Sequence, residues 1–118
     1  MLPEQFRCYL VTKDDAGNIR GEFTHRLLAE LPAGEVLIRV AYSSLNYKDA
    51  LAATGNPGVN KTFPHIPGVD AAGVVAQSGV YEFVPGDPVL ATGYDIGANR
   101  WGAWAEYVRV LQDWVVPL

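Results

Sequence analysis

The amino-acid sequence predicts a mainly β fold, a small barrel or sandwich built from short strands. Apolar residues alternate with polar ones over short stretches, turn-forming residues separate these stretches, and helical periodicity is almost absent. The 118 residues are enough for one domain and too few for two. Apolar residues make up 49% of the chain and charged residues 19%, a composition typical of a chain that folds around a core.

Short strands are expected in sequence, each bounded by turn-forming residues. In the first of them Phe6, Cys8 and Leu10 alternate with their neighbours, as in a strand with one buried face. The expected strands cover residues 6–11, 22–28, 36–42, 69–76, 89–92, 103–110 and 114–116. Glycine, proline and aspartate recur in the turns between them, at residues 14–18, 31–35, 67–68, 84–87, 93 and 97.

One segment breaks the strand pattern, because residues 46–54 suit a short helix. Asn46 is placed to cap this helix, and Asp49, three residues later, can reach back to the backbone amide of the cap. The residues that follow are mostly good helix formers, and Gly55 can end the helix in a left-handed conformation. One face of the helix is shared by Tyr47, Ala50, Leu51 and Thr54.

Charge and composition exclude several classes of function. The net charge of −4 and the pI of about 5.0 argue against a nucleic-acid partner, which favours a basic surface. No apolar stretch approaches the roughly 18 residues of a membrane span, and the first residues do not resemble a signal segment. A single cysteine excludes an internal disulfide framework. We therefore expect a cytoplasmic protein with no membrane partner.

Common catalytic signatures are absent from the sequence. No two glycines are spaced G-x-G, so the chain carries no dinucleotide-binding fingerprint. A zinc site would have to combine Cys8, His25 and His65 with a carboxylate. The favoured alternative is a small buried residue at Cys8 and structural histidines in strands or turns. We therefore expect no metal.

The most informative polar residues lie where the strand over residues 36–42 ends and the helix begins. Asn46, Tyr47 and Asp49 place an amide, a phenol and a carboxylate at this junction, and strand ends on a rigid scaffold are common functional positions. The structural alternative is that Asn46 only caps the helix and Tyr47 only packs. Asp70 enters an apolar strand, where it is expected to accept hydrogen bonds from turn amides.

A series of sequence blocks in a fixed order carries a family resemblance. The blocks are SSLNYKDALA at residues 43–52, FPHIPGVDAAG at 63–73, FVPGDPVL at 83–90, TGYDIG at 92–97, WGA at 101–103, AEY at 105–107 and DWVVP at 113–117. Each block alone is a weak signal, but the ordered series is specific. From about residue 36 onward the chain resembles the zinc-free quinone oxidoreductase branch of the medium-chain dehydrogenase/reductase superfamily. More narrowly, it resembles the acrylyl-CoA reductase subfamily.

This resemblance implies a GroES-like catalytic domain over residues 1–118, a distorted small β-barrel with one or two short helices. In the family this domain precedes a Rossmann NADP-binding domain, and the active site is the cleft between the two. Residues 1–118 are expected not to include that second domain. The implied function is the catalytic half of a zinc-independent, NADPH-dependent reductase of activated double bonds. Its implied substrates are acyl-CoA esters or quinones. The chain alone is expected to be inactive and to hold no NADPH.

The resemblance also implies roles for particular residues. Asn46 and Tyr47 match family positions that approach the nicotinamide and its ribose, so both are candidate catalytic and cofactor-binding residues. Tyr47 is the candidate proton or hydrogen-bond donor. Asp49 joins this cofactor-binding set by fixing the helix cap and orienting its neighbours. The zinc enzymes of the superfamily carry a cysteine where Asn46 lies. Three basic residues are expected either to meet phosphates or to be solvated, namely Lys48, Lys61 and Arg100.

Other expectations concern a loop and a surface. Ala103 stands where the subfamily has a second glycine, and alanine resists positive φ, so the family conformation of this loop is open to question. A face around Tyr47 and Trp114, left bare without a second domain, is expected to promote self-association. The alternatives to a reductase are a free-standing β-barrel that binds a ligand or partner without catalysis, and a co-chaperonin-like ring.

Overall fold

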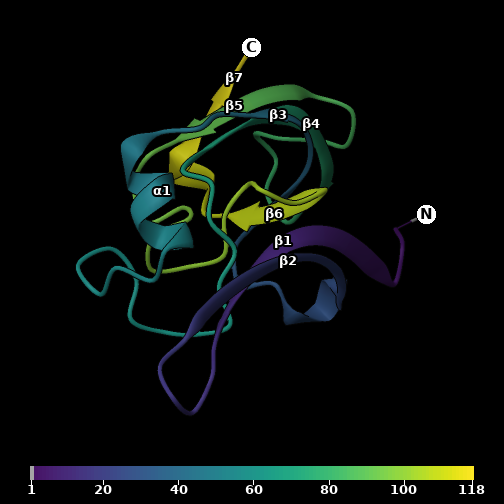
Figure 1. The fold of residues 1–118 in the computed structure, drawn as a ribbon. Coiled ribbons are helices and arrows are strands. Elements are labelled where there is room, and N and C mark those ends of the chain that lie inside the picture. The colour runs from purple at the N-terminus through teal and green to yellow at the C-terminus, as the bar shows by residue number, and fades with distance from the viewer. Residues whose placement is uncertain (1) are drawn as a thin grey trace.

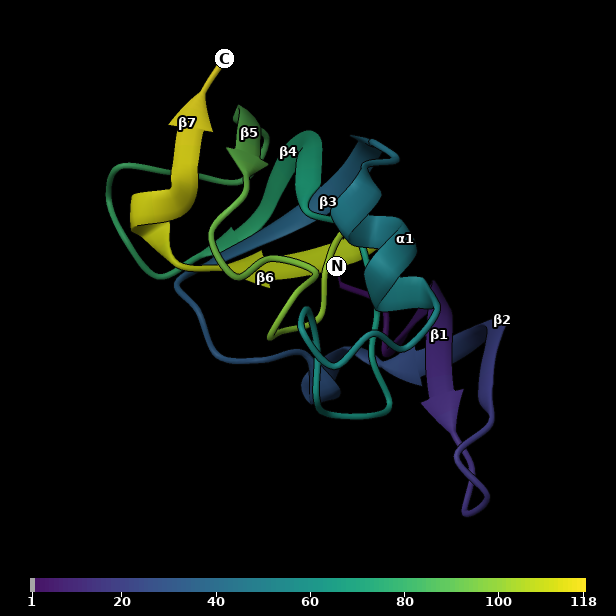
Figure 2. The ribbon, with the colours of Figure 1, turned by 60° about the vertical axis from the view of Figure 1, so that its left-hand side comes forward.

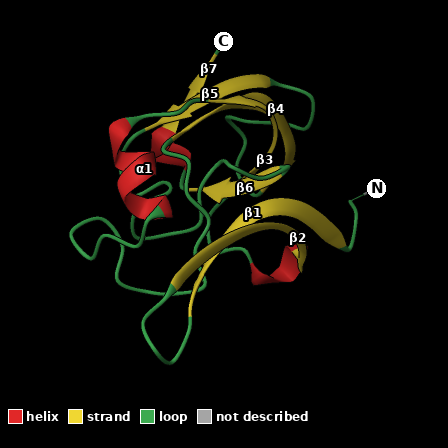
Figure 3. Ribbon diagram, viewed as in Figure 1, coloured by secondary structure: helices red, strands yellow, loops and turns green. Residues whose placement is uncertain are grey.

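The computed structural model describes residues 2–118 and contains two antiparallel sheets and one short α-helix (Figures 1 and 3). The strands are β1 Gln5–Lys13, β2 Ile19–Leu27, β3 Val36–Ser43, β4 Asp70–Ser78, β5 Pro88–Thr92, β6 Tyr107–Val110 and β7 Val115–Pro117. The helix is α1 Tyr47–Ala53, and single 3₁₀ turns cover Leu28–Glu30 and Gln112–Trp114. The predicted mainly β class is confirmed. No helix within residues 2–118 is both long and apolar enough to span a membrane.

The β1–β2 hairpin forms one sheet, and the other five strands form the second in the order β6-β3-β4-β5-β7. Strands β6 and β7 lie at opposite edges of this larger sheet and do not pair with each other, so the barrel is open rather than closed (Figure 2). Helix α1 lies beside the end of β3, where the chain leaves the sheet (Figure 2).

All the expected strands are present, but some of their ends differ from the prediction. The strand expected over residues 103–110 begins only at Tyr107. The segment before it is held by irregular contacts instead: the backbone N–H groups of Ala103 and Trp104 donate to Gly68 O and Pro67 O. Strand β2 starts earlier than expected, because its pairing with β1 continues to the Lys13–Ile19 pair.

Strand β3 joins the two apolar clusters of the fold. Val36 and Ile38 belong to a cluster on the inner face of the larger sheet, whereas Leu37 belongs to a second cluster with residues of β1. All three side chains are buried. Both faces of the sheet are therefore buried at the start of this strand, because residues of β1 pack on the second face there.

The outer face of the larger sheet carries an apolar row that crosses four strands. Direct cross-strand pairing places Tyr42, Ala72, Leu90 and Val116 side by side. Their sequence neighbours Ala71, Ala91 and Val115 form the corresponding row on the inner face, inside the first apolar cluster. Tyr42 is 76% exposed and Val116 is 55% exposed, so the two ends of this outer row are open to solvent.

Three glycines allow the loops below the sheet to approach one another at backbone distance. A Cβ on Gly97 would lie 2.5 Å from the backbone of Gly68, and a Cβ on Gly102 would lie 2.3 Å from Gly68 O. Ala103, which follows this contact, is buried and does not have a positive φ. The departure from glycine at this position therefore costs no backbone strain.

Replacing Gly97 with alanine is expected to lower the free energy of unfolding by about 2–5 kcal/mol, because left-handed strain and overpacking add. Gly93→Ala is the matched control, since the φ of Gly93 is +70° and that of Gly97 is +71°. A Cβ at Gly93 would have no described atom within 4 Å apart from its chain neighbours, so only the strain of about 1–2 kcal/mol remains. Urea denaturation measures both, and equal losses would refute the proposed close packing.

Candidate functional site

The carboxylate of Asp49 joins the start of α1 to the turn before β4. Its side chain is 0% exposed. Oδ1 accepts hydrogen bonds from the backbone N–H groups of Gly68 (3.1 Å) and Val69 (2.9 Å), and Oδ2 accepts one from the N–H of Asn46 (2.9 Å). A buried carboxylate needs such donors, and bonds to a charged acceptor are among the stronger ones in proteins. Asp49 therefore makes the predicted bond to the cap amide and two further bonds to a distant turn.

Asn46 occupies the N-cap position, but its side chain makes no cap hydrogen bond. Its amide group Nδ2 instead donates to Ser44 Oγ (2.8 Å) and to Asp70 Oδ2 (3.0 Å), with a longer contact to Asp49 Oδ2 (3.4 Å). The amide group thus bonds mainly to one hydroxyl and one carboxylate. Asn46 and Asp49 nevertheless form a capping box, in which Asp49 Oδ2 accepts from the Asn46 N–H.

Asp70 does not accept the turn amides that the sequence suggested for it, because Asp49 already accepts them. Its Oδ2 accepts hydrogen bonds from the Ser44 hydroxyl (2.7 Å) and from the Asn46 amide. Ser44, Asn46 and Asp70 therefore form a polar network between the end of β3 and the start of β4. Sequence reasoning did not single out Ser44, and its only signal was its position in the block before Asn46.

Tyr47 lies on the outward side of α1 and is 81% exposed. Of the helix residues predicted to share its face, Ala50 and Thr54 are also exposed. Leu51 is instead half-buried and packs beside Ala52 against a small apolar cluster. The phenol forms no hydrogen bond within the described chain. It is therefore free to contact a ligand or another polypeptide.

The three candidate phosphate-binding cations differ in environment. Lys48 and Lys61 are exposed. Arg100 donates from Nη2 to the backbone carbonyls of Ala33 (2.6 Å) and Arg109 (2.9 Å), and its guanidinium lies over the ring of Trp114. Burial lowers the pKa of Arg100 from its usual value. These contacts give Arg100 a structural role in holding loops together.

Cys8 and His65 are both buried, and neither makes a hydrogen bond to the polar network. Burial raises the pKa of the Cys8 thiol to about 11, so the thiol remains protonated at neutral pH. His65 places Nε2 2.8 Å from Gly97 O, and burial lowers its pKa. His25 is exposed on β2. Within residues 2–118, no group of three or more His, Cys, Asp or Glu side chains is arranged to hold a metal ion.

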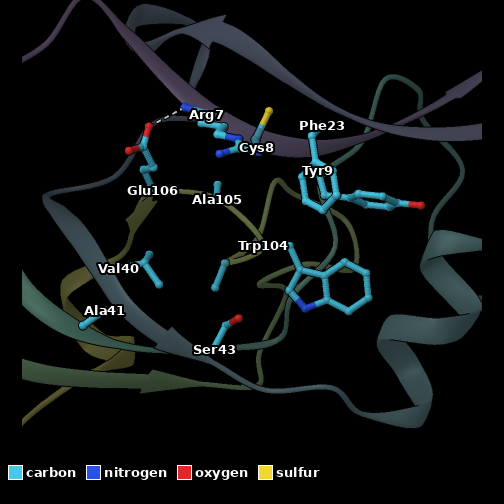
Figure 4. Close-up of a pocket in the computed structure, with 11 residues that line it drawn as sticks. Arg7, Cys8, Tyr9, Phe23, Val40, Ala41, Ser43, Trp104, Ala105 and Glu106 are labelled. Carbon is cyan, nitrogen blue, oxygen red and sulfur yellow. Dashed lines mark hydrogen bonds between the residues drawn. The ribbon is translucent and has the colours of Figure 1, made fainter.

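A groove of about 630 Å³ lies between the β1–β2 hairpin and the end of β3 (Figure 4). Tyr9, Phe23 and Trp104 give it an aromatic wall, and Ser43 lies at its end next to the polar network. The backbone N–H of Arg7 donates to the Glu106 carboxylate (2.6 Å) across its far end. Asn46, Tyr47 and Asp49 do not line this groove.

The polar network adjoins the outer face of the larger sheet. Asp70 pairs with Thr92 across β4 and β5, two residues from the Ala72–Leu90 pair of the outer row. Because alternate residues of a strand share a face, Asp70 lies on the same side of the sheet as that row. The site is therefore a polar network bordered by an apolar sheet face and by the exposed Tyr47.

Comparison with known proteins places these features in a family. The alcohol dehydrogenase GroES-like domain matches residues 32–118. Acrylyl-CoA reductase AcuI of Ruegeria pomeroyi is 39% identical over 114 residues, which cover 96% of this chain and 34% of that protein.

Two solved structures are similar in fold as well as in sequence. The yhdH oxidoreductase of Salmonella enterica in complex with NADP has a TM-score of 0.90 and 44% identity, covering 95% of this chain and 34% of that one. Bacillus subtilis yhfP with NAD bound has a TM-score of 0.91 and 39% identity, covering 98% and 35%. The chain thus spans about a third of the length of these relatives.

The Asp49→Asn variant is expected to lose about 2–4 kcal/mol of unfolding free energy, because it weakens bonds to a charged acceptor and turns an amide group toward backbone donors. Asp70→Asn is the matched comparison and should lose about 1 kcal/mol or less, since Asp70 is only half-buried and bonds only to side chains. Urea denaturation of both variants tests the ranking, and a larger loss for Asp70→Asn would contradict it.

Proposed function

Because the chain belongs to the alcohol dehydrogenase GroES-like domain family, we propose that it forms the catalytic part of a zinc-independent, NADPH-dependent reductase of activated double bonds. The proposed substrates are acyl-CoA esters of the acrylyl type or quinones, and the proposed location is the cytoplasm. The observation that carries the proposal is the Ser44–Asn46–Asp70 network beside the exposed Tyr47. This arrangement holds one amide rigidly and leaves one phenol available for a reacting molecule.

The hydrogen-bonding groups at the start of α1 fit a nicotinamide nucleotide. Asn46 uses its amide hydrogens on Ser44 and Asp70. Its carbonyl oxygen has two lone pairs and is the group proposed to accept a bond from a carboxamide or a ribose hydroxyl. Tyr47 can donate or accept. Asp49 is fully buried, so its proposed contribution to cofactor binding is indirect: it fixes the backbone that carries Asn46 and Tyr47.

The proposed division of roles follows from which donors are already used. When bound, NADPH supplies a hydride to the β-carbon of the substrate double bond. Negative charge then develops on the substrate carbonyl oxygen, and hydrogen-bond donors must stabilise it in a zinc-independent reaction. The Ser44 hydroxyl and the Asn46 amide already donate to Asp70. Tyr47 is therefore the proposed donor to this oxygen.

A second, dinucleotide-binding domain is part of the proposal, because pyrophosphate binding generally uses a helix N-terminus and backbone amides that face the ligand. Residues 1–118 are proposed to form the GroES-like domain of this enzyme. The second domain is proposed to pack on the apolar row of Tyr42, Ala72, Leu90 and Val116, beside Tyr47. A cofactor held at that contact would meet Asn46 and Tyr47.

A chimera tests the proposed reaction. Residues 1–118 replace the corresponding third of the Salmonella relative, and oxidation of NADPH is followed with acrylyl-CoA and with a soluble quinone. Turnover is expected with at least one substrate, and Tyr47→Phe should lower kcat about 100-fold, the usual cost of removing one donor to a developing oxyanion.

Tyr81→Phe serves as the control for this experiment, because Tyr81 is fully exposed in the turn region between β4 and β5. Binding of NADPH by the chimera shows that it has folded. A folded, NADPH-binding chimera without turnover would contradict the reductase and favour a binding module without catalysis. Turnover that is unchanged by Tyr47→Phe would contradict the role of the phenol.

The chain by itself is proposed to self-associate through the outer row, since a large apolar patch on an isolated domain tends to be covered. Trp114 is half-buried and stacks on Tyr94, so Val116 is the better position for a test. Val116→Lys should lower the apparent mass at high concentration in sedimentation experiments. Val84→Lys is the control, since Val84 is 52% exposed and lies outside the row. A strict monomer in the unmodified chain would refute self-association.

A further inference from the structure

Trp104 connects three separate parts of the fold. Its backbone N–H donates to Pro67 O (3.0 Å), and its backbone carbonyl accepts from the N–H of Tyr9 (2.9 Å). Its indole Nε1–H donates to Ser44 O (3.1 Å). The residue thus contacts β1, the turn before β4, and the segment between β3 and α1. None of these contacts belongs to a regular strand ladder.

Aromatic neighbours fix the orientation of the indole ring. Tyr9 packs edge-on against Trp104, with ring centroids 5.7 Å apart and an interplanar angle of 69°. Tyr9 is itself packed against Phe23, with centroids 5.3 Å apart. Figure 4 shows the indole in the groove between Tyr9 on one side and Ser43 on the other. A ring held in this way presents its N–H in one direction.

The carbonyl that receives this hydrogen bond lies where regular pairing has ended. The ladder between β3 and β4 stops at the Ser43–Ala71 pair, and α1 begins at Tyr47. Ser44 therefore lies in a connecting segment that neither the sheet nor the helix holds. Yet its hydroxyl is the central member of the polar network, since it accepts from Asn46 and donates to Asp70.

We propose that Trp104 is a positioning residue for the reductase site: its indole N–H holds the Ser44 backbone so that the Ser44 hydroxyl stays between Asn46 and Asp70. This inference rests on the proposed function for its catalytic meaning. Trp104 acts through Ser44 and makes no contact with the reacting atoms. The aromatic wall of the groove thereby controls how rigidly the Asn46 amide is held.

Trp101 offers a matched control within the same loop. It is also half-buried, and its indole Nε1–H also donates to a backbone carbonyl, Pro64 O, at 2.9 Å. Its ring lies under the guanidinium of Arg26, and it has no hydrogen bond to the polar network. Trp101→Phe and Trp104→Phe therefore remove the same donor type at two positions, only one of which touches Ser44.

The experiment measures hydrogen exchange of the Asn46 side-chain amide in the 118-residue chain by ¹H–¹⁵N NMR. Trp104→Phe should speed this exchange roughly fivefold, the factor that the loss of one ordinary hydrogen bond corresponds to. Trp101→Phe should leave it unchanged. The exchange rate is measured rather than the chemical shift, because replacing an aromatic ring shifts nearby resonances even where the ring does not position the amide.

A reciprocal measurement keeps the proposal testable if Trp104→Phe does not fold. Asp70→Asn leaves both tryptophans in place and should shift the indole N–H resonance of Trp104 but not that of Trp101. Equal exchange of the Asn46 amide in both tryptophan variants, or an unmoved Trp104 resonance in Asp70→Asn, would overturn the inference. These readouts need neither NADPH nor turnover, so their failure is distinct from failure of the proposed reaction.

Discussion

The burial of one carboxylate constrains the whole site. Asp49 has no solvent contact, so its charge must be balanced by hydrogen-bond donors within the fold. Three backbone N–H groups supply this balance, one at the helix start and two in the turn at Gly68–Val69. These bonds fix the start of the helix to the start of β4. The two are distant in sequence, since Asp49 and Val69 are 20 residues apart. The distance between Asn46 and Asp70 follows from this connection.

The turn at Gly68–Val69, which donates to Asp49, packs closely against two other loops, and side chains there would clash. Gly68 has a φ of +112°, and its neighbours Gly97 and Gly102 approach it closely enough to exclude a Cβ. The hydrogen bonds from Gly102 N to Ile66 O and from Ala103 N to Gly68 O tie these loops together. The same loop region then continues to Trp104 and reaches Ser44. The buried carboxylate of Asp49 and the close packing of the glycines therefore fix the turn at Gly68–Val69. The indole of Trp104 fixes the Ser44 backbone beside it.

Much of this could be predicted from local sequence. The strands were visible as alternating apolar stretches, and the bond from Asp49 to the cap amide follows from spacing alone. The use of Asp70 could not be predicted, because its partner Ser44 lies 26 residues away and only the pairing of β3 with β4 brings them together. The structural role of Arg100 likewise depends on the carbonyl of Ala33, 67 residues away. The ordered sequence blocks predicted the family, which the comparisons confirm.

The proposed function resides in the Ser44–Asn46–Asp70 network, the exposed phenol of Tyr47 and the adjoining outer face of the sheet. The central claim is that Asp49 accepts the turn amides and so holds the network in place. Hydrogen exchange of the Gly68 and Val69 backbone amides tests this claim directly. The account predicts that both exchange as slowly as the core amides of β4, through global unfolding only. Exchange of both at the rate of an exposed loop, while the β4 amides stay protected, would contradict it.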